Sequence, residues 1–424
     1  MEGRDNTAPM RRATVGVLAA ALVVAACGTS DGGVADGTST PEPPTAPSAT
    51  ETRDTSPPST DPVPETTQPV TPLAINHLQV IGSHNSFHLK PQATLFEGIT
   101  AVSPELAESI EYSHRSLTEQ LERFGIRQFE IDVFADPEGG LYSNRAANAV
   151  VGLDPVAPEP ELQEPGYKVL HTQDYDYETT CLTLVLCLAE IEAWSSANPN
   201  HLPVMIMLEI KTQSVPDAAA AAGIDLTIDL PWTTPVATSA ELLDALDAEI
   251  ASVFDRDQLI TPDDVRGDAA TLEAAVLERG WPTIEDGRGN VLFLLNNQGD
   301  TRDMYLDGRP NIEGRPMFTS ANPGDADAAV VRLDDPNSPG IVEVAEAGYM
   351  IRTRTDSPTA DARANDTTDR QAAFASGAQF LSTDYYLPSE YFDSPYVVAF
   401  PNGAIARCNP VTAPPTCTDD QLVE

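Results

Sequence analysis

Basic residues are scarce in this sequence. Its 24 lysines and arginines stand against 65 aspartates and glutamates, which gives a formal net charge of −41. A chain this acidic repels the phosphate backbone, so we expect no nucleic-acid partner. Long apolar runs are scarce too: the run at 13–26 is shorter than the roughly 20 residues that span a bilayer, and no second run reaches that length. The composition therefore disfavours both a nucleic-acid-binding protein and an integral membrane protein.

The apolar run at 13–26 follows Arg11 and Arg12 and ends at Cys27. A basic start before a short apolar run is typical of a signal peptide, which we place at 1–27. Residues 24–27, VAAC, resemble the bacterial lipoprotein cleavage box, so Cys27 is predicted to carry lipid. The alternative is ordinary secretory cleavage nearby, with Cys27 unmodified. We therefore predict an extracytoplasmic protein that is lipid-anchored to the bacterial cell membrane or secreted.

Cysteine is rare as well. With Cys27 set aside, only Cys181, Cys187, Cys408 and Cys417 remain. An even number in an exported chain indicates disulfides, and neither pair has the ligand spacing of a zinc site. Three pairings are open, and we favour Cys181 with Cys187 and Cys408 with Cys417 because each closes a short loop. A helix through both Cys181 and Cys187 would turn them apart, so Cys181 must precede the helix.

Large apolar residues are almost absent from 28–72, which is rich in proline, threonine and serine. Such a segment cannot bury a core, so it is predicted to be a disordered tether. One folded domain is expected at 73–424, and we expect it to be a monomer.

The domain alternates apolar strands with helical segments. The expected strands are 78–83, 127–134, 168–171, 203–211, 290–295, 316–319, 349–353 and 379–382. Residues 328–332 compete for the sixth place, and 258–260 form a possible extra strand. About eight strands in alternation with helices predict an α/β fold, a (β/α)8 TIM-type barrel with loop insertions.

Several helix ends are visible in the sequence. Ser103 and Ser116 are expected to cap two helices, and Gly125 ends the second of them. The segment 215–282 is interpreted as an insertion that contains a helix capped by Thr238.

Acidic side chains gather at the ends of the predicted strands. Glu130 and Asp132 are two residues apart on one strand, so they share a face. Glu209 ends another strand and Asn85 follows the first. Active sites of such barrels lie at the carboxyl ends of the strands, and neighbouring carboxylates need a cation. Four oxygen ligands of this kind suit calcium better than zinc or a redox metal.

Two histidines also follow strands, His84 after the first and His171 after the third. A cation, one histidine that takes a proton, another that gives one, and a basic residue such as Lys211 or Arg354 together indicate phosphodiester cleavage. Lys211 has an alternative role as a plain ion-pair partner of Glu209.

The other four histidines are expected outside the site. His201 precedes its strand, at the end of the barrel that serves stability. His88 and His114 could approach the site from loops, but they are interpreted as solvated loop residues, which are commoner; His77 has no assigned role.

These motifs resemble the calcium-dependent phosphoinositide-specific phospholipase C family. The more specific matches are GSHNSF (82–87), FEIDVF (129–134), VLH (169–171) and MLEIK (207–211). Weaker matches are VLFLLNN (291–297), IRTRTD (351–356) and QFLSTDYY (379–386).

The resemblance implies cleavage of phosphatidylinositol, at a membrane surface, to diacylglycerol and an inositol phosphate. It assigns calcium to Asn85, Glu130, Asp132 and Glu209. It makes His84 the residue that supports attack by the inositol 2-hydroxyl, and His171 the general acid. By looser matches it places Lys211 and Arg354 at the phosphate and Asp384 and Tyr385 in the inositol pocket. No segment resembles a pleckstrin, EF-hand or C2 domain.

Two other functions stay open. One is a glycerophosphodiester phosphodiesterase-like enzyme on the same barrel, which an apolar rim around the mouth would disfavour. The other is a lipoprotein that binds calcium or glycans without turnover, which the two histidines disfavour because binding alone needs neither an acid nor a base.

Overall fold

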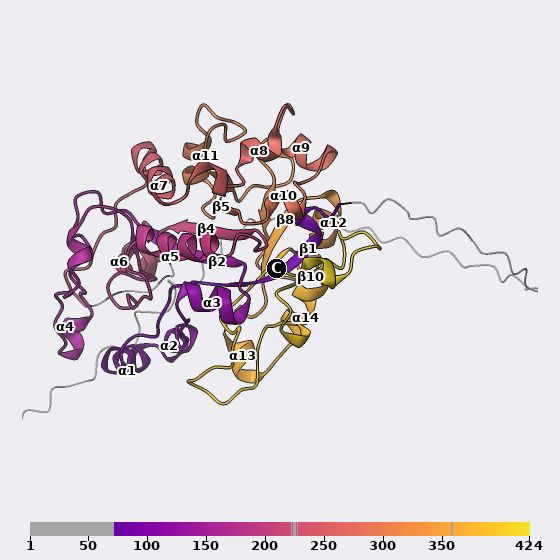
Figure 1. Cartoon of the computed structure of the whole chain (residues 1–424). Coiled ribbons are helices and arrows are strands. Elements are labelled where there is room, and N and C mark those ends of the chain that lie inside the picture. The colour runs from indigo at the N-terminus through magenta and orange to yellow at the C-terminus, as the bar shows by residue number, and fades with distance from the viewer. Residues whose placement is uncertain (1–71, 222, 224–225, 227, 358) are drawn as a thin grey trace, which may run out of the picture. The chain divides into compact units, whose positions relative to one another are not determined.

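The computed structural model describes residues 72–424, apart from 222, 224, 225, 227 and 358 (Figure 1). Its central sheet has eight parallel strands: β1 (Leu78–Ser83), β2 (Gln128–Phe134), β4 (Val204–Ile210), β5 (Val291–Leu295), β6 (Met317–Thr319), β7 (Val330–Arg332), β8 (Met350–Arg354) and β9 (Phe380–Thr383). They pair in the order β6-β5-β4-β2-β1-β9-β8-β7. A parallel bridge between Ser320 and Val330 joins the two edge strands, so the ring is nearly closed. The predicted (β/α)8 barrel is confirmed.

Two predictions about the barrel strands need correction. Residues 168–171 were expected in the barrel, but β3 (Lys168–Val169) pairs antiparallel with the end of β2 and lies outside the ring. The competing segment is instead a barrel strand of its own, β7. The reason is that an apolar run does not reveal its direction: after β2 the chain returns through a long connection that contains α4 (Asn148–Val151), and then pairs antiparallel with the end of β2. The possible strand at 258–260 is reduced to one bridge, between Leu259 and Val291.

The strands are connected by helices. These are α1 (Ala93–Val102), α2 (Pro104–Ser109), α3 (Leu117–Phe124), α4 (Asn148–Val151), α5 (Leu184–Ala197), α6 (Val215–Ala221), α7 (Ala240–Val253), α8 (Pro262–Arg266), α9 (Leu272–Glu278), α10 (Ile284–Gly287), α11 (Asp300–Leu306), α12 (Ile341–Ala347), α13 (Ala360–Ala364) and α14 (Thr368–Ala375). Among the described residues, none of the helices is both long and apolar enough to cross a bilayer.

The predicted helix caps form with one exception. Ser103 caps α2 and Ser116 caps α3, which ends at Gly125 with φ 65°, a left-handed conformation that glycine adopts without strain. The cap of α7 is Ser239 rather than Thr238, because the Ser239 hydroxyl accepts the N–H of Leu242 at the first turn.

Both predicted disulfides form. Cys181 and Cys187 have Cα atoms 5.2 Å apart, and Cys181 precedes α5, as the pairing required. Cys408 and Cys417 close the second loop. Cys408 ends β10 (Ala406–Cys408), which pairs antiparallel with the start of β1. The second disulfide therefore fastens the chain below the barrel, at the end opposite the carboxyl ends of the strands.

A second apolar cluster lies apart from the main core, on the loops that follow β1 and β2. It joins α1, α2 and the long β2–β3 connection, which Figure 1 shows together on one side of the barrel. Its buried members include Leu95, Ile99, Leu106, Leu162 and Tyr175. This cluster stabilises loops that carry candidate site residues. The predicted signal peptide, Cys27 and all of the predicted tether except residue 72 lie outside the described residues.

Candidate active site at the barrel mouth

The chain turns sharply after β1, where the first candidate residues lie. Asn85 has φ 44°, in the left-handed region that asparagine tolerates better than most residues. Its carbonyl oxygen accepts the backbone N–H of His88 at 2.8 Å. The Ser86 N–H donates to the Glu130 carbonyl and the Ser86 hydroxyl accepts the Glu130 N–H, both at 2.8 Å. The turn therefore fastens Asn85 beside β2.

Three carboxylates meet at the carboxyl ends of β2 and β4. Glu130 and Asp132 lie on one face of β2, and Asp132 lies opposite Glu209 of β4 in the parallel register. Oxygen atoms of the three side chains lie within 4.8 Å of one another. Asp132 is fully buried and Glu130 nearly so. Like charges this close and this far from water are stable only with cations beside them.

Asp132 has the environment of a metal ligand. Among the described residues, neither of its carboxylate oxygens has a hydrogen-bond partner. The Lys211 ammonium is 3.2 Å from one of them, within ion-pair distance but without hydrogen-bond geometry. Burial raises the pKa of Asp132 well above its usual value, and Glu209 and Glu130 add to that shift. Two carboxylate oxygens without hydrogen-bond partners, next to two further carboxylates, form a set of ligands that suits calcium.

Asn85 completes this set with an amide. Its side-chain N–H donates to the Tyr112 hydroxyl at 3.0 Å, which leaves its carbonyl oxygen as the group that can bind a cation. The structure thus brings Glu130, Asp132 and Glu209 together. The turn that carries Asn85, the fourth predicted ligand, is hydrogen-bonded to β2.

Two basic side chains offset part of the acidic charge. Lys211 contacts Glu209 at 2.7 Å, the ion pair that the sequence left open. Although burial lowers the pKa of Lys211, Asp132 and Glu209 raise it further, so the ammonium stays charged. Arg352 contacts Glu130 and is shared with Asp334. No role was predicted for Arg352, because the sequence of β8 does not show which residue of another strand this arginine contacts.

His84 is held by an aspartate that directly follows β9. Its Nδ1 is 2.8 Å from one oxygen of Asp384, and Arg354 donates to the other oxygen at 2.8 Å. Burial and Arg354 lower the pKa of His84 below its usual value, outweighing Asp384. Burial would raise the pKa of Asp384, but His84 and Arg354 hold it well below its usual range. An ionised Asp384 therefore fixes the Nδ1–H tautomer of His84 and leaves Nε2 free to accept a proton.

His171 is held in the same way by a different aspartate. Its Nδ1 is 2.5 Å from Asp176, and the other oxygen of that carboxylate is 2.8 Å from Nε2 of His88. Burial would raise the pKa of Asp176, but His88 and His171 lower it to about 2. No role was predicted for Asp176, and His88 was considered only as a loop residue that could approach the site. The only signal was an aspartate five residues after His171, within one loop.

The interpretation of His88 and His114 as solvated loop residues is wrong. Both are buried, because the loops that carry them fold inward over the barrel mouth. Nε2 of His114 is 2.7 Å from the carbonyl oxygen of His84, and its ring stacks on Tyr386. Burial lowers the pKa of His114 to about 4. His201 lies before β4 and its Nε2 is 2.7 Å from the Ser195 hydroxyl, outside the site.

Tyr385 lies beside Asp384 but is buried. Its ring packs at right angles to Tyr396, with centroids 6.2 Å apart, and among the described residues its hydroxyl has no hydrogen-bond partner. Contacts of Asp384 and Tyr385 with inositol therefore remain predictions from the sequence.

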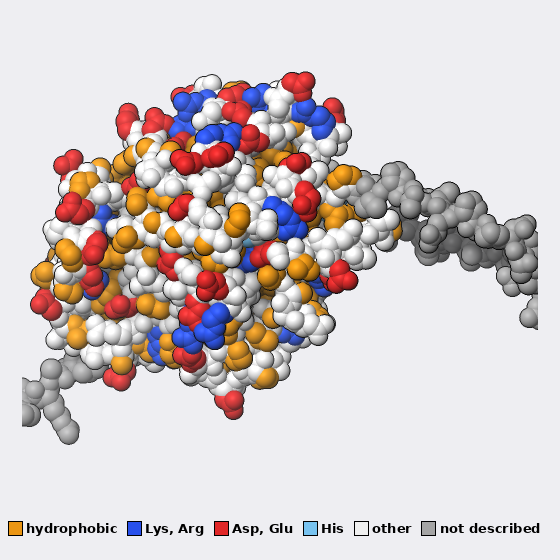
Figure 2. Space-filling view, in the orientation of Figure 1, with side chains coloured by type: hydrophobic (Ala, Val, Ile, Leu, Met, Phe, Trp, Pro, Cys, Tyr) orange, Lys and Arg blue, Asp and Glu red, His pale blue; other side chains and the backbone are white. Residues whose placement is uncertain are grey.

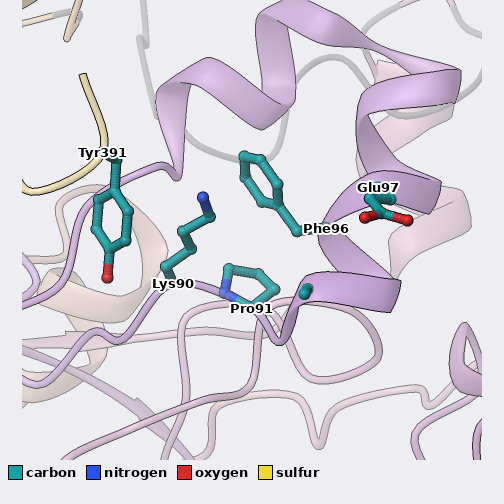
Figure 3. A pocket seen from close by; sticks show the side chains of 6 residues that line it. Lys90, Pro91, Phe96, Glu97 and Tyr391 are labelled. Atoms are coloured by element: carbon teal, nitrogen blue, oxygen red, sulfur yellow. The ribbon is translucent and has the colours of Figure 1, made fainter. Parts of the chain in front are cut away.

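Two hollows adjoin the site and share Tyr391 as a wall. The smaller is lined by Tyr112, Asp384 and Tyr385 among others. The larger, of about 400 Å³, is lined by Lys90, Pro91, Ala93, Phe96, Glu97 and Tyr391 (Figure 3). The Lys90 ammonium points between the two aromatic rings of this pocket, 3.9 Å from the centre of the Phe96 ring and 4.4 Å from that of Tyr391. The two hollows are therefore neighbours through Tyr391, and the smaller one reaches Asp384.

Some apolar side chains are exposed on the segments that follow β2 and β9. Val156, in the connection that leaves the carboxyl end of β2, is 64% exposed, and Val150 and Tyr391 are partly exposed. Acidic side chains are spread over the face seen in Figure 2, with apolar ones between them. Tyr391 also lines the smaller hollow, which reaches Asp384.

Comparisons with known proteins find one matching family and several solved structures. A family profile described as "Phosphoinositide phospholipase C, Ca2+-dependent" matches residues 73–410. A calcium-dependent phosphoinositol-specific phospholipase C from Pseudomonas sp. is 15% identical, with a TM-score of 0.48, covering 79% of this chain and 95% of that chain. The enzyme from Streptomyces antibioticus is 19% identical, with a TM-score of 0.44, covering 77% of this chain and 100% of that chain. No curated protein matches the chain.

The family match spans nearly all of the described residues and includes every motif on which the resemblance rested. The chain therefore belongs to the calcium-dependent phosphoinositide phospholipase C family, a family of phosphodiester-cleaving enzymes with calcium as their cofactor.

Proposed function

We propose that the chain cleaves phosphatidylinositol to diacylglycerol and an inositol phosphate. The observation that carries the proposal is that two histidines, each hydrogen-bonded to its own buried aspartate, share the barrel mouth with one cluster of oxygen ligands. Binding alone needs neither a proton acceptor nor a proton donor, whereas cleavage by an internal hydroxyl needs both.

His84 takes the proton of the inositol 2-hydroxyl as its oxygen attacks phosphorus. Its Nδ1–H is engaged by Asp384, so Nε2 is the accepting atom. The phosphorus–oxygen bond to glycerol breaks, and His171, oriented by Asp176, gives a proton to the departing glycerol oxygen. One proton is taken and one is given, and the first product is a cyclic inositol phosphate that water can open.

Asn85, Glu130, Asp132 and Glu209 would hold the calcium ion. When bound, calcium stabilises negative charge on the phosphate and favours ionisation of the attacking hydroxyl. Lys211 and Arg354 would add positive charge near the phosphate, and Asp384 with Tyr385 would border the inositol. The calcium assignment is supported by the Asp132 carboxylate, whose two oxygens have no hydrogen-bond partner among the described residues.

We also propose that the chain acts as a monomer outside the cell, anchored by lipid on Cys27 or secreted. The sequence around Cys27 and the two disulfides support export. A tethered enzyme of this kind would meet phospholipid at a membrane surface.

The alternative of a soluble-diester phosphodiesterase on the same barrel is less well supported. Tyr391 is exposed and lines the hollow that reaches Asp384, which favours a substrate within a lipid surface. A non-catalytic binding protein is disfavoured by the two separate histidine–aspartate pairs.

The test is release of water-soluble inositol phosphate from phosphatidylinositol vesicles, with calcium and with chelator. We expect release with calcium only, and a loss of about 10²–10⁴-fold in His171→Ala, because the glycerol oxygen then leaves without a proton. If the wild-type protein is inactive on vesicles but cleaves glycerophosphoinositol, the soluble-diester function replaces this proposal. Inactivity on both, with calcium bound, would instead identify a binding protein.

We propose that the exposed Val156 meets the lipid surface, and this leads to a separate prediction. Val156→Glu should lower activity on vesicles about tenfold, because a buried valine contributes about 1.5–3 kcal/mol when it leaves water. Activity on glycerophosphoinositol should not change. Val423→Glu is the matched control, since Val423 is 68% exposed and precedes Glu424, which pairs with Arg127 at the start of β2. Equal effects of both substitutions on vesicles would contradict a lipid-facing role for Val156.

A further inference from the structure

Asp176 accepts hydrogen bonds from two histidines at once, and only one of them belongs to the proposed mechanism. His171 uses one carboxylate oxygen, at 2.5 Å, and His88 uses the other, at 2.8 Å. Asp176 and His88 are fully buried, and His171 is 6% exposed. The arrangement links the loop after β1 to the loop after β3 through a single side chain.

His88 is itself held rigidly. Its backbone N–H donates to the carbonyl of Asn85, and its own carbonyl accepts the N–H of His114, at 2.8 and 2.9 Å. Its ring lies against Tyr112, with centroids 4.3 Å apart. Among the described residues Nδ1 of His88 has no hydrogen-bond partner, so its one strong polar contact is the bond from Nε2 to Asp176.

Asp176, by contrast, comes from a loop. It lies in a short turn closed by hydrogen bonds between Thr172 and Asp176, between β3 and α5. A carboxylate bound by His171 alone could rotate about its terminal bond, and the imidazole would then lose its fixed orientation. The second bond, from His88, prevents that rotation because each oxygen is engaged.

We propose that His88 is a positioning residue for proton donation: it clamps Asp176 so that His171 presents Nε2 to the glycerol oxygen. The inference rests on the proposed function of His171 as the general acid. It assigns to His88 no contact with substrate and no proton transfer of its own. It also means that the Asn85 turn and His171 are held by one connected set of contacts.

The test compares two leaving groups. Phosphatidylinositol releases a glycerol alkoxide, which needs a proton, whereas an inositol p-nitrophenyl phosphodiester releases a stable phenolate, which needs none. We expect His88→Leu to lower kcat on phosphatidylinositol about 10–100-fold, the usual effect of losing an orienting partner, with KM unchanged. Activity on the nitrophenyl substrate should stay within about twofold. His88→Gln, whose amide can donate from a position close to Nε2, should recover most of the loss.

The control is His201→Leu, which removes another buried histidine with a side-chain hydrogen bond but lies outside the site. It should affect both substrates equally, through stability alone. Equal losses on both substrates in His88→Leu, or no recovery in His88→Gln, would overturn the inference. His171→Ala distinguishes the role of His171 from the role of His88. If His171→Ala lowers activity on phosphatidylinositol more than on the nitrophenyl substrate and His88→Leu does not, only the role of His88 fails. If His171→Ala shows no such difference, the proposed general acid is wrong.

Discussion

Replacing His84 with alanine is expected to reduce cleavage of phosphatidylinositol by about 10³-fold or more, without loss of calcium binding. The imidazole is the only proton acceptor that the proposed mechanism assigns to the inositol 2-hydroxyl, and its lowered pKa keeps it unprotonated at neutral pH. His84 contributes no oxygen to the acidic cluster, so calcium should still raise the melting temperature of the variant. The measurement is the initial rate of inositol phosphate release, with the calcium-induced change in Tm recorded in parallel.

The matched control lies at the other end of the same strand. His77 precedes β1, and its ring accepts the N–H of Ala74 three residues earlier, so His77→Ala should keep nearly full activity. Asp384→Asn should fall between the two, with a loss of about 10²-fold, because an amide can donate to Nδ1 and favour the wrong tautomer of His84. A fully active His84→Ala variant would remove this residue from the mechanism.

The fold was largely readable from the sequence because its local signals agree. Buried parallel strands appear as continuous apolar runs, and PVMIMLEIK at 203–211 is the clearest of them. Where the signal failed, the cause was nonlocal. The segment at 168–171 looks like a strand and is one in part, but only its pairing with β2 shows that it runs antiparallel. Residues 328–332 were predicted only as a competitor for the sixth strand, because Val330–Arg332 is short; its pairing with β8 makes it a barrel strand of its own.

The part of the site at the strand ends was predictable, because the carboxyl ends of barrel strands lie together. Glu130, Asp132 and Glu209 follow from that rule and from the two-residue repeat of a strand. Asp176 and His88 do not, since each sits in a loop whose inward fold depends on the apolar cluster around α1 and α2. Sequence spacing could not pair His88 with a residue 88 positions away. Charges that meet across strands, such as Arg352 and Glu130, were missed for the same reason.

Replacing Asp132 with asparagine is expected to abolish calcium-dependent activity and calcium binding while leaving the calcium-free protein at least as stable as the wild type. Both oxygens of Asp132 lack hydrogen-bond partners among the described residues, so its charge is a cost to the calcium-free fold. With calcium at 100 times its Kd, the wild type should gain about 2.7 kcal/mol of unfolding free energy, and Asp132→Asn should gain almost none. Chemical unfolding with calcium and with chelator measures both quantities.

Asp136→Asn is the matched control and, unlike Asp132→Asn, should destabilise the calcium-free protein. Asp136 is also buried just beyond β2, but its carboxylate is 3.5 Å from the fully buried ammonium of Lys168. Its neutralisation leaves that ammonium without its charged partner, which should lower the free energy of unfolding by about 3 kcal/mol with or without calcium. If Asp132→Asn also destabilises the calcium-free protein by this amount, then Lys211 alone satisfies the carboxylate. The acidic cluster would in that case be a structural ion-pair network rather than a calcium site.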